Sequence, residues 1–75
     1  MTRGQRQVLR IIREAPEHVR QHGVTGFYVR YGGHGLPSPE SIDACERQLR
    51  ALARRGLVAQ TDQHPCKWVP VEGQA

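Results

Sequence analysis

The residues best suited to chemistry are six side chains of the types that bind metals. They are two cysteines and four histidines: Cys45, Cys66, His18, His22, His34 and His64. His18 and His22 stand four residues apart, but the paired cysteine and histidine spacings of zinc fingers are absent. The cysteines form no CxxC pair and are too few for a disulfide framework. We therefore expect no metal and no cofactor, with Cys45 packing as a small hydrophobe and both thiols reduced.

Nucleophilic catalysis has no candidate in this sequence. No nucleophile has a base at a recognised spacing, and no GxxxxGK loop is present to hold phosphates. The run GlyGlyHisGly at 32–35 is more simply a loop than a site. We expect that the chain is not an enzyme.

The basic residues are the next candidates, because arginine donates a planar fork of hydrogen bonds that suits phosphate. Eleven basic residues, of which only Lys67 is a lysine, oppose seven acids, which gives a formal net charge of +4. Residues 1–13 hold no acid, and the whole excess lies there, on Arg3, Arg6, Arg10 and Arg13. This charge either faces a polyanion or simply solvates an outer helix face.

The element that positions these arginines is an amphipathic helix over 3–15. Its apolar stripe repeats at 3.6 residues and the arginines fall on the opposite face. Pro16 either kinks this helix or ends it and starts another, and Gly23 closes the segment as a C-terminal cap.

Residues 24–37 are ambiguous. Phe27, Val29 and Tyr31 alternate as in a strand, whereas Phe27, Tyr28 and Tyr31 would share one face of a short helix capped by Thr25. The glycines and Pro37 that follow indicate a loop.

The second long helix is predicted over about 39–55. Ser38 would cap it, Pro39 would occupy its first position, and Gly56 would end it. Asp43 with Arg47 and Glu46 with Arg50 have the i, i+4 spacing of ion pairs.

A β-hairpin is predicted at the C-terminal end. Residues 57–59 and 67–71 would form its strands, with a turn at 61–65 and Pro70 at a strand end or edge. We assign residues 1–71 to one domain and 72–75 to a frayed tail. The predicted core joins both helical stripes to the hairpin through Val8, Ile11, Ile12, Ile42, Leu49, Leu52, Leu57 and Trp68.

This order of elements predicts an α+β fold: a small winged helix-turn-helix of about three helices with a C-terminal β-hairpin wing. Three stretches, at 2–13, 18–23 and 41–58, carry a resemblance to the N-terminal DNA-binding domain of the LexA repressor family. They read ThrArgGlyGlnArgGlnValLeuArgIleIleArg, HisValArgGlnHisGly and SerIleAspAlaCysGluArgGlnLeuArgAlaLeuAlaArgArgGlyLeuVal. This sequence has two more residues before the long helix than the family's pattern. It therefore stays open whether Ser38 or Ser41 corresponds to the start of the family's helix.

The resemblance implies that the exposed face early in the long helix reads operator bases. It would place five residues at the groove: Ser41, Asp43, Ala44, Glu46 and Arg47. Asp43 stands where the family has Asn, and Arg47 replaces an acid, so any operator must differ from the family's. The family's autoproteolytic domain has no counterpart in this sequence, so self-cleavage is not implied.

The sequence therefore predicts a double-stranded DNA-binding transcription regulator of repressor type, with the long helix in the major groove. The expected phosphate contacts are Arg3, Arg6, Ser38, Arg54, Arg55 and Lys67. We expect two protomers to bind together, in solution or only on DNA. No apolar run is long enough to span a membrane, and we expect a cytoplasmic protein. The alternative is a winged-helix adaptor or inhibitor that docks an acidic protein through the first helix.

Overall fold

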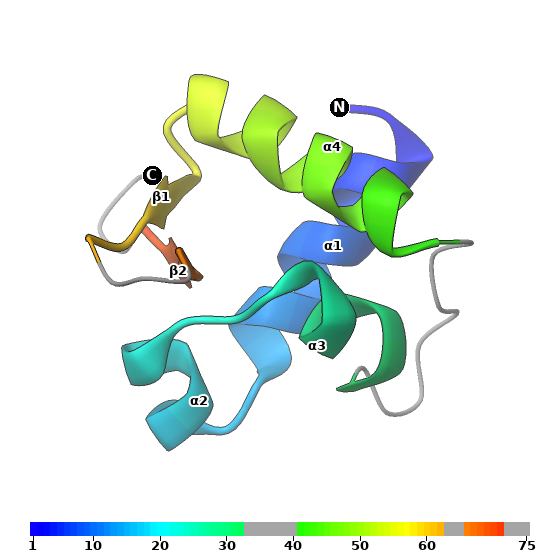
Figure 1. Cartoon of the computed structure of the whole chain (residues 1–75). Helices are drawn as coiled ribbons and strands as arrows, with labels where there is room; N and C mark the ends of the chain where they lie inside the picture. Colours follow the sequence, from blue (N-terminus) through cyan, green and yellow to red (C-terminus); the bar gives the residue numbers. More distant parts are fainter. Residues whose placement is uncertain (33–40, 63–65, 72–75) are drawn as a thin grey trace.

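The computed structural model describes residues 1–32, 41–62 and 66–71, which form four helices and one antiparallel hairpin (Figure 1). The elements are α1 (Arg3–Glu14), α2 (Glu17–His22), α3 (Gly26–Gly32), α4 (Ile42–Arg54), β1 (Val58–Gln60) and β2 (Trp68–Pro70). The predicted α+β class with a C-terminal hairpin is confirmed. The predicted count of about three helices is too low, because the N-terminal half forms three helices by itself. The assigned tail at 72–75 lies outside the described residues.

Proline divides the N-terminal segment into two helices. Thr2 and Gln5 form a reciprocal capping box, in which each side chain accepts from the other's backbone N–H at 3.2 and 3.1 Å, so α1 starts at Arg3. The helix ends before Pro16, which then occupies the N-cap of α2. Gly23, at φ 89°, ends α2 as predicted, in a backbone conformation that side-chain-bearing residues rarely adopt. Of the two alternatives for Pro16, termination and restart is therefore the observed one.

The ambiguous middle segment begins as a helix. The hydroxyl oxygen of Thr25 accepts from the Tyr28 N–H at 3.1 Å, which satisfies a free donor at the start of α3. Val29 is fully buried, whereas Phe27 and Tyr31 are exposed. A strand would have sent these three residues to one face. The helix separates them and directs both aromatic rings outward.

The second long helix starts later than predicted. The Ser41 hydroxyl oxygen accepts from the Ala44 N–H at 3.0 Å, so Ser41 is the cap and α4 begins at Ile42. The predicted cap Ser38 and first position Pro39 lie outside the described residues. Both serines have the sequence signature of an N-cap, and only the packed position of the helix decides between them. Gly56 follows the end of α4 at φ 76°, as predicted.

The predicted hairpin is confirmed, and a third segment of the chain pairs with it. Val58, Ala59 and Gln60 of β1 pair with Pro70, Val69 and Trp68 of β2. On its other side, Trp68 forms an antiparallel bridge with Val24, through backbone bonds of 2.7 and 2.8 Å. The segment before α3 is thereby fixed to the hairpin, which anchors α3 at its N-terminal end.

One core joins α1, α3, α4 and the hairpin. Six of the predicted core residues are at most 4% exposed: Val8, Ile11, Ile12, Leu49, Leu52 and Trp68. Leu57 is partly buried against this cluster. Ile42 is wrongly predicted, because it lies in the first turn of α4, beyond the edge of the core, and is 40% exposed. Leu9, Val24, Val29, Cys45 and Val58 complete the cluster.

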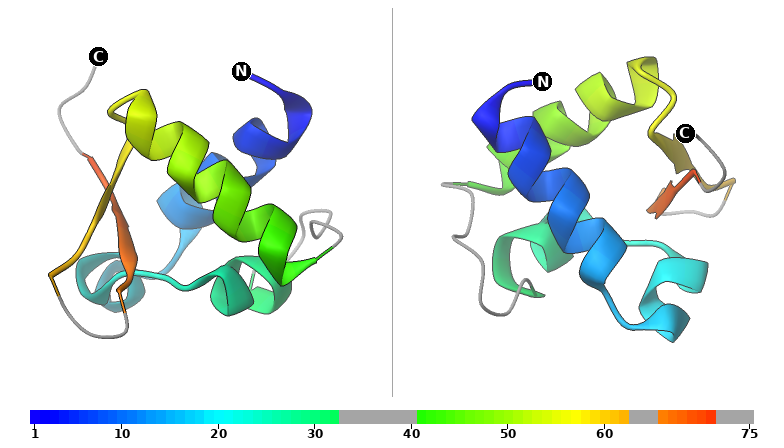
Figure 2. Two further views of the ribbon diagram at one scale, coloured as in Figure 1. Left: turned by 45° about the horizontal axis from the view of Figure 1, so that its top comes forward. Right: turned by 180° about the vertical axis from the view of Figure 1, so that it is seen from behind.

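The two long helices present different outer faces. In Figure 2, α4 lies across the near side of the left view, whereas α1 lies on the near side when the molecule is seen from behind. α4 packs against both α1 and α3. Each long helix therefore has one free face, and these faces point in different directions.

Candidate nucleic-acid interface

The outer face of α4 carries a row of three arginines. Arg47, Arg50 and Arg54 follow one another at spacings of three and four residues, which places them on one side of a helix. All three are exposed, and the opposite side of the helix buries Cys45, Leu49 and Leu52. We call this set the α4 arginine row. It forms a linear cationic ridge on the longest helix of the described chain.

Carboxylates do not neutralise this row within the described part of the chain. The predicted pairs Asp43 with Arg47 and Glu46 with Arg50 are both wrong, since the single salt bridge among residues 1–32, 41–62 and 66–71 joins Arg10 to Glu14. Exposed i, i+4 pairs gain only about 0.3–0.5 kcal/mol, which other contacts easily override. The guanidinium groups of the row are therefore available for an external anion.

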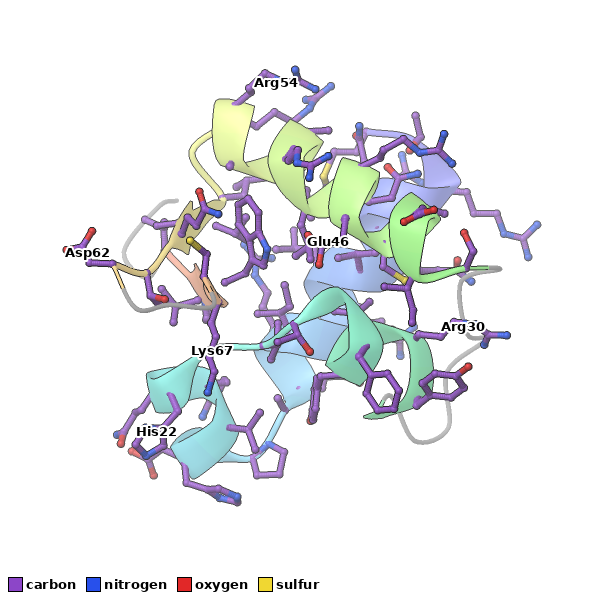
Figure 3. The ribbon with its side chains drawn as sticks, in the orientation of Figure 1. His22, Arg30, Glu46, Arg54, Asp62 and Lys67 are labelled. Atoms are coloured by element: carbon purple, nitrogen blue, oxygen red, sulfur yellow. The ribbon has the colours of Figure 1, made fainter. Side chains whose placement is uncertain are left out.

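Glu46 has a different partner. Its carboxylate Oε1 accepts from the Gly26 N–H at 3.1 Å, at the start of α3 (Figure 3). A Cβ built on Gly26 would lie 2.7 Å from the same oxygen, so this close approach depends on glycine. The contact engages one of the two carboxylate oxygens and gives Glu46 a structural role at the α3–α4 joint. Its base contact stays a prediction.

The four other predicted base contacts lie in the first turns of α4 and differ in exposure. Asp43 and Arg47 are exposed on the outer face. The Ser41 hydroxyl is engaged as the helix cap, and Ala44 is partly buried. Asp43 thus lies one turn before Arg47 on the same side of α4, in line with Arg50 and Arg54.

The predicted phosphate contacts are dispersed over the molecule. Arg54 and Arg55 lie exposed at the end of α4, and Arg3 and Arg6 lie exposed on α1. Arg3 adjoins Gly4, which approaches Gln48 of α4. Lys67 is partly buried, and in Figure 3 its side chain points toward α2, away from Arg54. Ser38 lies outside the described residues.

The second cationic surface is the outer face of α1. Arg3, Arg6, Arg10 and Arg13 are all exposed there, as predicted, and Arg10 pairs with Glu14 at 3.1 Å. A hollow of about 280 Å³ lies on this face, with its walls formed by Met1, Arg6, Leu9, Arg10, Arg13 and Glu14. We call this surface the α1 arginine face.

Sequence reasoning missed Arg50 as a site residue, because its spacing to Glu46 suggested an internal ion pair. The signal that could have found it is the i, i+3, i+7 spacing of Arg47, Arg50 and Arg54. It also missed the exposed aromatic pair of α3. Phe27 and Tyr31 were recognised as potential helix neighbours, but their burial could not be read from the sequence.

The two cysteines do not form a disulfide with each other. Cys45 and Cys66 are both free thiols, the first in the core and the second on the surface. Burial raises the pKa of the Cys45 thiol above its ordinary value, and the nearby positive charge of Arg30 acts in the opposite direction.

Within the residues that the structure describes, no three metal-binding side chains gather at one place. The helices of the same residues include none with the length and apolarity to cross a bilayer.

The geometry of α4 is thus that of a surface helix with a cationic outer ridge, braced by α1, α3 and a hairpin. No family model, curated protein or solved structure matches this chain.

Proposed function

We propose that this chain binds double-stranded DNA, with the outer face of α4 in a major groove, and that it acts as a transcription regulator. The observation that carries the proposal is the α4 arginine row, whose guanidinium groups are exposed and lack carboxylate partners among the described residues. A helix fits a major groove about 12 Å wide. Arginine is the side chain that most commonly recognises guanine there, through two parallel hydrogen bonds.

The order of the elements supports the same proposal. A short helix, a connection and a longer exposed helix precede a β-hairpin, which is the order of a winged helix-turn-helix. In that arrangement α3 would support α4, and the hairpin would be the wing. Membership of the LexA-like group stays a proposal that rests on the three matching stretches, and so does a cytoplasmic location.

Positions along the row suggest different roles. Arg47 lies nearer the start of α4, the end that enters the groove in helix-turn-helix proteins. Arg54 lies in the last turn, where a groove curves away and phosphates come closest. We therefore assign base recognition to Arg47 and phosphate contact to Arg54, with Arg50 between them.

The test measures binding to mixed-sequence duplex DNA over a series of salt concentrations. Arg50→Ala and Arg54→Ala should each weaken binding to all sequences and lower the slope of log affinity against log salt by about one unit. Arg13→Ala is the matched control, because it removes the same charge from the α1 arginine face. It should leave the slope nearly unchanged.

Arg47→Ala is tested on a duplex selected from a random pool. The substitution should cost about 1–3 kcal/mol at one base pair and leave the other positions unaffected. The proposal fails if the wild-type protein shows no salt-dependent duplex binding. It also fails if Arg13→Ala weakens binding more than the variants of the row.

A second candidate function is favoured by the hollow on the α1 arginine face. Its walls combine the guanidinium groups of Arg6 and Arg13 and the Arg10–Glu14 ion pair with Leu9 and Met1, a net positive lining that suits an acidic protein segment with an apolar side chain. An acidic amphipathic peptide is the appropriate probe. In this alternative Arg13→Ala would weaken peptide binding, whereas Arg50→Ala would not.

A further inference from the structure

The line of the α4 arginine row begins with a carboxylate. Asp43 is exposed in the first turn of α4 and precedes Arg47 by four residues, so it continues the row toward the start of the helix. A negative charge at this place weakens the attraction of the row to phosphates. A surface that only neutralised the DNA backbone would therefore gain from a neutral or basic residue here, and Asp43 has no role in that attraction.

Within the described part of the chain, Asp43 forms no salt bridge. Arg47 stands at a suitable spacing, and Arg30 lines the same surface hollow, but neither pairs with it. An acid in the first turn does stabilise a helix through the helix dipole. That structural role needs no DNA and predicts no base preference, so experiment can separate it from recognition.

The chemistry of an ionised carboxylate restricts the base that it can recognise. A carboxylate only accepts hydrogen bonds, so the base must donate. In the major groove, cytosine presents its N4 amino group and no acceptor. Adenine also donates, through N6, but its N7 accepts and repels a carboxylate, whereas guanine and thymine present acceptors and no donor. Cytosine is therefore the base that an aspartate matches best.

The order of the side chains along α4 fits such a contact. Aspartate is short, so its carboxylate reaches a base edge only where a helix lies deep in the groove, as the N-terminal residues of a recognition helix do. Arg47, one turn later, has the longer side chain that a greater distance needs. Four residues advance a helix by about 6 Å, whereas successive base pairs are about 3.4 Å apart. The bases opposite Asp43 and Arg47 are therefore separated by about two base pairs.

We propose that Asp43 selects cytosine, and that the DNA site of this protein contains a cytosine about two base pairs from the guanine recognised by Arg47. This inference rests on the proposed function and extends it from duplex DNA in general to a sequence preference. The arginines supply affinity, and Asp43 supplies discrimination by rejecting bases that present only acceptors. Duplex binding by the row does not depend on this assignment.

The test determines base preferences by selection from a random duplex pool, followed by titration of single-position variants of the selected duplex. Arg47→Ala locates the guanine. The wild-type protein should bind at least about fivefold more weakly when the neighbouring cytosine is replaced by any other base. Asp43→Ala should lose this preference and keep the preference for the guanine. Asp43→Asn should prefer adenine instead, because an amide donates to N7 and accepts from N6.

The affinity for mixed-sequence duplex distinguishes recognition from a structural role. Asp43→Ala removes a negative charge, so it should bind mixed-sequence duplex at least as tightly as the wild type at the same salt concentration. A variant that was only less stable would bind every sequence more weakly. Glu17→Ala is the matched control, because Glu17 is an exposed acid in the first turn of α2, which lies away from α4 (Figure 1). It should leave the base preference unchanged.

A modified duplex tests the contact on the wild-type protein itself. N4-methylcytosine keeps its pair with guanine but places a methyl group where the free N4–H would donate. At the selected cytosine it should weaken wild-type binding at least about fivefold and leave the binding of Asp43→Ala unchanged.

Three results would overturn the assignment of Asp43 while duplex binding stands. They are a selected site with no cytosine within about three base pairs of the guanine, a cytosine preference that either Asp43 variant retains, and a methyl group without effect. If the wild-type protein binds no duplex at all, this inference fails together with the proposed function.

Discussion

Cys45 illustrates how a single buried group makes stability depend on pH. Burial raises the pKa of this thiol above its ordinary value of 9.0, so the unfolded chain loses the proton first as the pH rises. The contribution is fully present below about pH 9 and is lost as the pH increases through the folded-state pKa. Denaturant unfolding should show the free energy of unfolding decreasing above pH 9, by at most about 1.4 kcal/mol per pH unit for one proton. Cys45→Ala should show a shallower decrease, and equal slopes would contradict this explanation.

The two thiols should also differ in reactivity. Cys66 is exposed and Cys45 is in the core, so an alkylating reagent at neutral pH should modify Cys66 first. Cys45 should react only when the domain opens, at a rate that increases with denaturant. Mass spectrometry of the labelled peptides measures both rates. Equal labelling of the two thiols under native conditions would show that α4 does not bury Cys45.

Glu46 should contribute to stability through the joint between α3 and α4. Glu46→Ala removes the acceptor of the Gly26 N–H and should cost about 1–2 kcal/mol. Glu46→Gln retains a side-chain oxygen and should cost less. Arg47→Ala, on the exposed face one residue away, is the control and should change stability by about 0.5 kcal/mol or less. If all three variants unfold at the same denaturant concentration, Glu46 does not stabilise this joint.

At the scale of elements, the apolar face of α4 is tested by a pair of substitutions on the same helix. Leu52 is fully buried and Leu52→Ala should cost about 2–5 kcal/mol, a large fraction of the stability of so small a domain. Ile42→Ala should cost about 1 kcal/mol or less, because Ile42 is 40% exposed. Thermal and denaturant melts of both variants measure the difference. A larger loss for Ile42→Ala would reverse the assignment of buried and exposed faces.

Patterns that repeat within one element were predictable from the sequence. The apolar stripes of α1 and α4 correctly gave their buried faces except at Ile42, and the Gly23 and Gly56 caps were correctly placed. The hairpin followed from its apolar runs and turn residues. In each case the local pattern and the final packing favour the same structure, so no competing contact alters the outcome.

Choices that depend on contacts between elements were not predictable. Ser38 and Ser41 are equivalent as caps until α4 is packed, and Glu46 accepts from a residue twenty positions earlier in the chain. The site shows the same limit. Arg47 was identified as a site residue, but Arg50 was expected to form an ion pair with Glu46. Helical spacing alone does not reveal that the Glu46 carboxylate accepts from the Gly26 N–H at the start of α3.

At the scale of the whole molecule, the proposed DNA-binding surface is the α4 arginine row. The α1 arginine face lies on the other side of the molecule and would remain uncovered. A domain of this size covers only a half-site, so two protomers should bind an inverted repeat. Titration at saturating concentrations should give two chains per selected duplex. One chain on a site without internal symmetry would argue against paired binding.

The central claim is that DNA binds the outer face of α4, and an NMR titration of the labelled protein with a selected duplex tests it most directly. Backbone amide resonances of Arg47, Arg50 and Arg54 should shift most, and those of Arg6, Arg10 and Arg13 should shift least. Raising the salt concentration should reverse the shifts, because phosphate contacts release bound counterions. Shifts confined to α1, or no shifts at duplex concentrations well above that of the protein, would contradict the account.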